Sequence, residues 1–84
     1  MVKQTNYWYS IATKILRAEM AKRNLTYEEL AKNLRQIGVE MNVGNLRARI
    51  SQGAFSAALL IQCLRAMGLK NLLIEDSYFE EKSQ

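Results

Sequence analysis

The chain has 84 residues, of which 49% are hydrophobic and 24% are charged. This length and balance fit one small globular domain with a single core and leave no room for a second domain. The sequence has no His and one Cys, which excludes a Ser-His-Asp or Cys-His catalytic pair, a four-ligand structural zinc site and an internal disulfide. We therefore expect a protein that is not an enzyme and holds no cofactor or metal.

The charge is unevenly placed along the chain. Residues 1–74 hold 11 basic and 4 acidic side chains, a net charge of +7, whereas residues 75–84 hold four acidic side chains and one basic one. A basic domain attracts polyanions, nucleic acid first among them, although the same charges also fit an ordinary solvated surface. We expect a domain over residues 1–74 and an acidic tail over residues 75–84 that frays, or that folds back on the basic surface and competes with DNA.

No segment of the sequence suggests export or a membrane. The first ten residues lack the apolar core of a signal peptide. The longest uninterrupted apolar run, residues 57–61, is far shorter than the ~20 residues that a membrane span needs. We therefore expect a cytoplasmic protein with no membrane partner.

Helical periodicity runs through nearly the whole chain, so we expect an all-α, compact bundle of four to five short helices. The first helix is predicted at residues 6–23, ended by Asn24, with one apolar stripe formed by Trp8, Ile11, Ala12, Ile15, Leu16 and Met20. This spacing favours a core position for Trp8 over the alternative that Trp8, with Tyr7 and Tyr9, stacks on nucleic-acid bases.

Capping signals place the later helices, which are predicted at residues 26–37, 42–52, 57–67 and 72–74. Thr26 and Glu29 have the spacing of a capping box, and Ser56 is the expected N-cap of the fourth helix. Gly68 followed by an apolar residue is typical of a Schellman-type helix end.

Two residues on the apolar stripes need separate interpretation. Glu19 lies in the middle of the stripe of the first helix, and a buried carboxylate requires a partner. We expect an ion pair with an arginine, Arg47 or Arg49. Cys63 lies on the core stripe of the fourth helix and is expected to be a small buried hydrophobe.

The order and spacing of these segments resemble a known family. Residues 25–31, LTYEELA, are similar to the GLSQEELA segment that opens the second helix of λ-repressor-like (Cro/C1-type) helix-turn-helix domains. Residues 56–68 resemble the fourth helix of that family, and Leu46, Ile50 and Gly53 its third helix and the glycine after it. The resemblance covers residues 10–74, and the chain also resembles a small group of uncharacterised bacterial domains.

The resemblance implies a protein that binds double-stranded DNA and regulates transcription, with the third helix in the major groove. Two features depart from the family. Tyr27 stands where the family usually has Gln, and the segment from Leu34 to Asn42 is longer than the usual turn. The longer turn bears on the angle between the second and third helices, and therefore on how the third helix would dock.

The outward face of the third helix carries the residues expected to contact bases. At 100° per residue, Leu46 and Ile50 face the core while the opposite side is small and polar, with an arginine on each shoulder. The base-reading candidates are Asn42, Gly44, Asn45, Arg47, Ala48 and Arg49. Two alternatives stay open: the small pair Gly44 and Ala48 suits close approach of another protein helix, or the face is simply solvated.

A second set of residues is expected to hold DNA phosphates, because free N–H groups at helix starts, hydroxyls and basic side chains all bind anions. The candidates are Lys14, Arg17, Thr26, Tyr27, Lys32, Ser51, Gln52 and Ser56. Domains of the resembled type usually act as dimers, and residues 72–79 are the expected homodimer surface. The alternative function is a protein-interaction module on the same fold, with a protein partner and no sequence-specific DNA binding.

Overall fold

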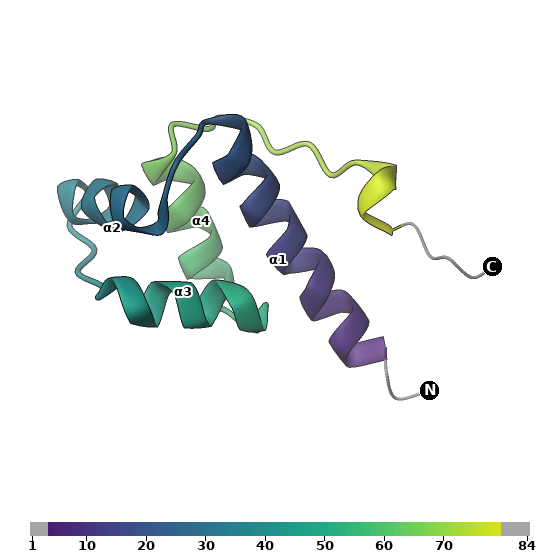
Figure 1. The fold of residues 1–84 in the computed structure, drawn as a ribbon. Helices are drawn as coiled ribbons and strands as arrows, with labels where there is room; N and C mark the ends of the chain where they lie inside the picture. Colours follow the sequence, from purple (N-terminus) through teal and green to yellow (C-terminus); the bar gives the residue numbers. More distant parts are fainter. Residues whose placement is uncertain (1–3, 80–84) are drawn as a thin grey trace.

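The computed structural model describes residues 4–79, which fold into four α-helices and one short 3-10 helix. The helices are α1 (Gln4–Lys22), α2 (Tyr27–Gln36), α3 (Val43–Gln52), α4 (Ala57–Ala66) and η1 (Asp76–Phe79). Figure 1 shows α1 crossing the molecule diagonally, with α3 along the lower side, α2 on the left and α4 behind. The described residues contain no strand, so the predicted all-α bundle is confirmed.

Three helices begin at the polar residue that the sequence predicts. The hydroxyl of Thr26 accepts the N–H of Glu29 at 3.1 Å, and the Glu29 carboxylate accepts the N–H of Thr26 at 2.9 Å, which completes the capping box. Asn42 caps α3 and Ser56 caps α4 through one side chain-to-backbone bond of 3.0 Å each. These bonds satisfy N–H groups that have no helical partner, and so fix where each helix starts.

Three helix ends share one geometry, at the residues where the sequence predicts the helices to end. Asn24 after α1, Gly38 after α2 and Gly68 after α4 adopt left-handed backbone, with φ of 55°, 88° and 79°. The N–H of the next residue then donates to a carbonyl of the preceding helix at 2.9 Å in each case. This is the Schellman motif, which satisfies carbonyls that the helix itself leaves unpaired.

The core lies where the C-terminal half of α1 meets α2, α3 and α4. Its largest fully buried side chains are Leu16, Leu30, Leu34, Leu46, Ile50 and Cys63. The prediction that Trp8 joins this core is wrong, because its side chain is 56% exposed. The N-terminal end of α1 extends beyond α2, α3 and α4 (Figure 1). These helices therefore bury the C-terminal part of the apolar stripe of α1 and do not cover its first residues.

The C-terminal end of α3 is fastened to α1. The buried hydroxyl of Thr13 donates to the carbonyl of Ile50, one of the last four carbonyls of α3. Gly53 follows with φ of 73°, and a Cβ at this position would overlap the carbonyl oxygen of Tyr9. Glycine is therefore required here for two reasons: the left-handed backbone, and the close approach of this backbone segment to that of α1.

The chain after α4 differs from the prediction. Residues 71–75 carry no helix, so the short helix predicted at residues 72–74 is wrong. Three consecutive apolar residues cannot nucleate a helix alone, and this stretch has no packing face that would compensate. The 3-10 helix η1 forms instead at Asp76–Phe79.

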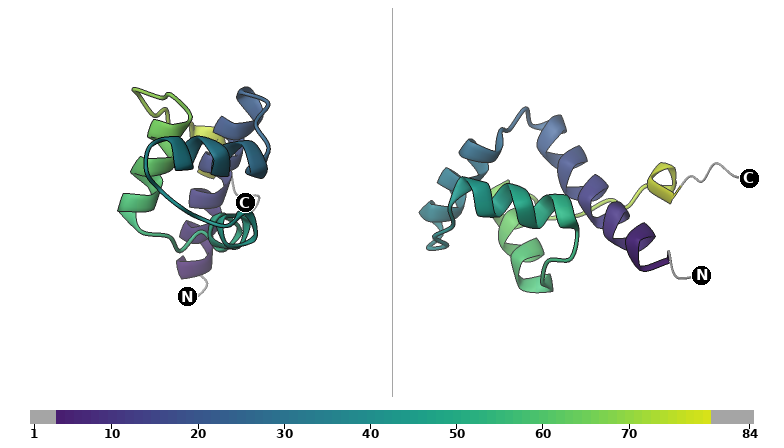
Figure 2. Two further views of the ribbon diagram at one scale, coloured as in Figure 1. Left: turned by 90° about the vertical axis from the view of Figure 1, so that its left-hand side faces the viewer. Right: turned by 60° about the horizontal axis from the view of Figure 1, so that its bottom comes forward.

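The helix η1 lies against α1, as the views in Figure 2 also show. The hydroxyl of Tyr7 donates to the carbonyl of Phe79 at 3.3 Å, and Nζ of Lys14 donates to the carbonyl of Tyr78 at 3.4 Å. The rings of Trp8 and Phe79 lie 6.1 Å apart. Residues 76–79 of the tail thus form a short helix against α1, whereas fraying of the tail stays a prediction, and Glu80 and Glu81 fall outside the described residues.

Glu19 is buried as predicted, with 3% of its surface exposed. Its carboxylate accepts from the guanidinium of Arg23 at 2.8 Å and from Nζ of Lys22 at 3.3 Å. The predicted partners, Arg47 or Arg49, are wrong. Residues three and four positions along a helix lie on the same face, so Lys22, the last residue of α1, and Arg23, which follows it, both lie close to the carboxylate.

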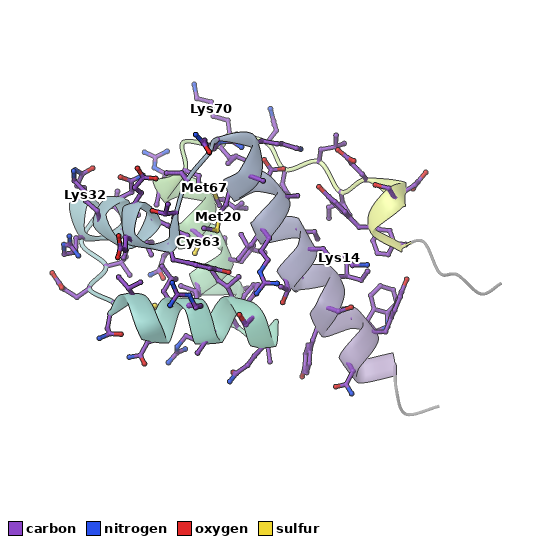
Figure 3. The ribbon with its side chains drawn as sticks, viewed as in Figure 1. Lys14, Met20, Lys32, Cys63, Met67 and Lys70 are labelled. Atoms are coloured by element: carbon purple, nitrogen blue, oxygen red, sulfur yellow. The ribbon has the colours of Figure 1, made fainter. Side chains whose placement is uncertain are left out.

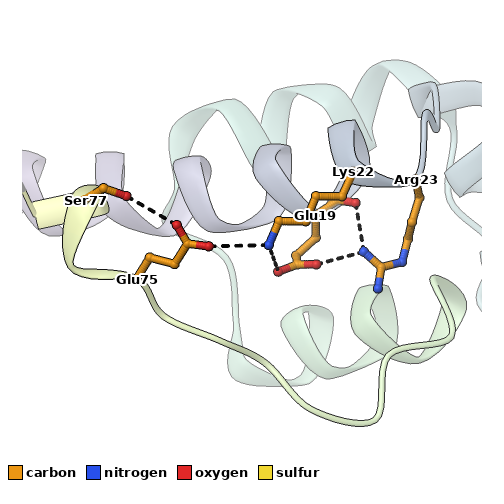
Figure 4. Close-up of polar contacts among 5 residues, drawn as sticks. All are labelled: Glu19, Lys22, Arg23, Glu75 and Ser77. Atoms are coloured by element: carbon orange, nitrogen blue, oxygen red, sulfur yellow. Dashed lines mark hydrogen bonds and ion pairs between the residues drawn. The ribbon is translucent and has the colours of Figure 1, made fainter.

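The same cluster ties the C-terminal segment to α1 (Figure 4). Lys22 also pairs with the carboxylate of Glu75 at 3.7 Å, and the hydroxyl of Ser77 donates to Glu75 at 3.4 Å. The hydrogen bond to Glu19 is the main cause that raises the pKa of Lys22. The described part of the acidic tail thus contacts cations of α1 and leaves α3 uncovered.

Candidate functional site

The helix α3 presents a polar outer face with small side chains at its centre. Leu46 and Ile50 are fully buried on the inner side, as the helical spacing predicts. The exposed residues of the helix are Gly44, Asn45, Arg47, Ala48, Arg49, Ser51 and Gln52. This face is therefore free for a partner that approaches from the lower side in Figure 1.

Beside this face, four side chains from three helices form what we call the basic cluster: Arg17, Tyr27, Arg47 and Ser51. Arg17 donates from Nε to the hydroxyl of Tyr27 at 3.1 Å and from a terminal nitrogen to the hydroxyl of Ser51 at 2.9 Å. The guanidinium of Arg47 lies 5.1 Å from the centre of the Tyr27 ring, a cation–π contact. Two cations from different helices thus converge on one tyrosine.

Neither arginine of the basic cluster has a carboxylate partner among the described residues, because the ion pairs found there involve Lys22 and Arg23. Like charges held together repel each other. A bound anion would offset this repulsion. The basic cluster is therefore suited to a phosphate or another anionic group.

The basic cluster borders a shallow hollow of about 400 Å³. Its lining consists of Arg17, Met20, Ala21, Leu25, Thr26, Tyr27 and Arg47. The apolar residues come from the end of α1 and the chain that follows it, and Arg17 and Arg47 are both part of the lining. The hollow therefore combines an apolar lining with two cations that can contact an anionic group.

The start of α2 offers less to an anion than the sequence suggests. The capping box occupies the side chain of Thr26 and the N–H groups of Thr26 and Glu29. Two carboxylates, Glu28 and Glu29, also stand in the first turn and repel an anion there. Tyr27 therefore contributes through its ring and hydroxyl in the basic cluster.

The remaining candidates are spread over the molecule. Asn42 and Ser56 use their side chains as helix caps. Lys14 points to the η1 side and bonds the carbonyl of Tyr78, whereas Lys32 stands exposed on α2 at the other end (Figure 3). The structure therefore gathers Arg17, Tyr27 and Ser51 from the predicted phosphate set, and it leaves Lys14 and Lys32 apart from them.

The pairing of Arg47 with Tyr27 was not predicted from the sequence. The sequence pattern indicates base contacts for Arg47 and a phosphate contact for Tyr27, with no link between the two residues. The two residues lie on different helices, and nothing in their spacing signals contact. The departure of Tyr27 from the resembled family was the one available sign that this position does something different here.

Other kinds of site have little support in the described part of the chain. Within residues 4–79 no three acidic or cysteine side chains lie together as metal ligands. The thiol of Cys63 is fully buried, and burial raises its pKa to about 11, so it stays protonated near neutral pH. No helix among these residues has both the length and the apolar character to cross a membrane.

The fold and this surface define a small all-helical domain with a basic, exposed helix. Residues 8–72 match a family described as a domain of unknown function, DUF6471, and the protein belongs to this family. The matched residues include α2, α3, α4 and most of α1, whereas η1 lies beyond them. No curated protein and no solved structure matches the chain.

Proposed function

We propose that this protein binds double-stranded DNA as a small transcriptional regulator, with α3 in the major groove. The observation that carries the proposal is the outer face of α3, which is exposed and polar and has small residues at its centre. Small side chains let a helix sit deep in the groove, which is wide enough to admit one α-helix. The resemblance to λ-repressor-like domains points the same way.

The exposed residues of α3 have the chemistry to read bases. The amide of Asn45 suits a bidentate contact with adenine, and the guanidinium of Arg49 suits the N7 and O6 atoms of guanine. In the basic cluster, Arg17 and Arg47 would hold a backbone phosphate, which positions the protein without reading sequence. Gln52 and Ser51, in the last turn of α3, would supply further phosphate contacts.

A second candidate function is a protein-interaction module without sequence-specific DNA binding. It is favoured by Gly44 and Ala48, which are both exposed and lie four positions apart on α3. Small residues at this spacing allow the backbone of another helix to approach closely. Neither function involves a catalytic step.

The test is a titration of labelled protein with a mixed-sequence duplex, followed through backbone amide shifts at low and moderate salt. We expect the shifts to concentrate on residues 42–53 and on Arg17 and Tyr27, and to weaken steeply as salt rises. Shifts spread evenly over the basic surface, or none at all, would contradict specific binding by α3. Shifts of residues 42–48 with a protein partner alone would favour the second candidate.

Variants of equal charge sharpen this test. Arg49→Ala removes a cation from α3, and Arg65→Ala removes an exposed cation from α4. We expect Arg49→Ala to weaken duplex binding about tenfold or more, the size of one good base contact. Arg65→Ala should leave affinity nearly unchanged. Equal losses would mean that the duplex responds only to net charge.

A further inference from the structure

The segment from Lys70 to Asp76 stands out because its backbone has few partners. In the described structure no hydrogen bond is made by the backbone of residues 70–74, and the next bond begins at the carbonyl of Glu75. Figure 4 shows this stretch as an open arc that stands away from α1. Unpaired N–H and C=O groups in a non-helical stretch are a template for pairing with another chain.

The same segment carries the exposed apolar side chains of this side of the molecule. Leu73 is 62% exposed and Ile74 is 50% exposed. Ile61, 65% exposed on α4, and Leu72 both line an adjacent hollow of about 260 Å³. Exposed apolar residues that adjoin one another mark interaction sites, whereas scattered single ones do not.

The sequence of the segment is self-complementary when it is laid antiparallel to itself. Lys70 begins it, Asp76 ends it, and Leu72, Leu73 and Ile74 lie between them. With Leu73 opposite Leu73, Leu72 meets Ile74 and the cation of Lys70 meets the carboxylate of Asp76. A two-fold interface requires this reciprocity: if residue i of one copy contacts residue j of the other, residue j of the first copy must contact residue i of the second.

We propose that the partner of this segment is a second copy of the chain, paired antiparallel about a two-fold axis at Leu73. Backbone hydrogen bonds between the two segments would give the affinity, and the apolar pairs with the two flanking ion pairs would fix the register. The proposal places the contact at residues 70–76. It overlaps the homodimer surface expected from the sequence, residues 72–79, but uses a non-helical stretch in place of the helix predicted at residues 72–74.

The position of the segment determines where the two α3 helices would lie in such a dimer. Lys70 lies at the top of Figure 3, whereas α3 lies at the bottom of Figure 1, drawn from the same side. The left view of Figure 2 likewise separates α3 from the chain after α4. A two-fold contact on one side therefore leaves the two α3 helices on opposite outer faces. If α3 binds DNA, the pair holds two duplexes rather than two half-sites of one.

The test uses charge reversal and mixing, with molecular mass measured by sedimentation over a hundredfold range of protein concentration and without DNA. Lys70→Glu alone and Asp76→Lys alone each place like charges opposite each other, so each should weaken the dimer about tenfold. Mixing the two variants restores both attractive pairs, as does the double variant. Both preparations should dimerise like the unmodified chain.

The controls are Lys32→Glu and Glu40→Lys, which make the same charge changes at exposed positions outside the segment and should not alter the dimer. A chain that is monomeric at every concentration would overturn the proposal. Dimers that ignore both reversals, or mixed variants that fail to recover, would overturn it as well. All variants change exposed side chains, and equal melting temperatures would show that they fold. Because no DNA is present, failure here leaves the proposed function untouched.

Discussion

The two halves of α1 lie in different surroundings. The C-terminal half, with Leu16 and the buried Glu19, is enclosed by the other helices, and we call this part of the molecule the enclosed region. The N-terminal half, with Trp8 at 56% exposure, extends beyond them and meets η1, and we call this part the open end. One periodic pattern continues through both halves, so a helical stripe predicts which face can be buried, but neighbouring elements decide how much of it is.

The largest effect is expected at the joint where the two regions meet. Gly53→Ala adds a Cβ that overlaps the backbone of Tyr9 and strains a left-handed residue. It should lower the free energy of unfolding by about 3 kcal/mol, the sum of the two costs. Gly68→Ala is the matched control, because its φ is also positive and nothing lies within 4 Å of the added atom. It should cost about 1 kcal/mol.

Urea unfolding of both glycine variants measures this difference. Equal losses would mean that left-handed strain alone is responsible, and that the close approach of α3 to α1 adds nothing.

The next effect tests the ion cluster of the enclosed region. Glu19→Ala removes the buried carboxylate that pairs with Arg23 and Lys22, and should cost about 2 kcal/mol of stability. Glu40→Ala removes an exposed carboxylate and should change stability by less than about 0.5 kcal/mol. Thermal unfolding of the two variants compares them. A loss from Glu19→Ala as small as that from Glu40→Ala would place the carboxylate in effective contact with water.

A pH dependence is expected from Cys63 in the enclosed region. Burial raises its pKa from 9.0 to about 11. The unfolded chain therefore loses the thiol proton first as pH rises. Its contribution to stability, on the order of 2 kcal/mol, is complete below pH 9 and is lost as the pH rises towards about 11. Denaturant unfolding between pH 8 and 11 should show a steeper fall for the unmodified chain than for Cys63→Ala. Parallel curves would contradict this account.

The smallest effect is expected at the open end. Trp8→Ala should cost less than about 1 kcal/mol, since most of the side chain already contacts water. Ile11→Ala, one turn further along α1, removes a side chain that is 3% exposed and should cost about 2 kcal/mol or more. Urea unfolding compares the two. A loss from Trp8→Ala as large as that from Ile11→Ala would show that η1 buries the indole more firmly than its exposure indicates.

Most of the fold could be predicted from signals between residues that are close together in the sequence. Thr26 with Glu29, Ser56 and Asn24 each involve residues within a few positions of one another, so the sequence alone predicts where those helices start and end. Burial of Trp8 depends on what packs beside it, and that is decided by the arrangement of all the helices. The partner of Glu19 depends on a competition between nearby and distant cations, which a sequence pattern does not rank.

In the candidate site, too, one part could be predicted from the sequence and the other could not. The exposed face of α3 follows from helical spacing, since Leu46 and Ile50 define the buried side. The basic cluster does not, because Arg17, Tyr27 and Arg47 come from three helices whose packing brings them together. The DNA-binding roles of both sets remain predictions.

The bond between Thr13 and the carbonyl of Ile50 has a consequence for how the protein tolerates change in length. Together with Gly53, it anchors α3 to α1 from the C-terminal end of α3. The connection over residues 37–42 joins the other end. With the orientation of α3 held by α1, insertions into this connection alter the path of the chain more than the direction of the helix. A change in the length of this connection is therefore compatible with an unchanged orientation of α3.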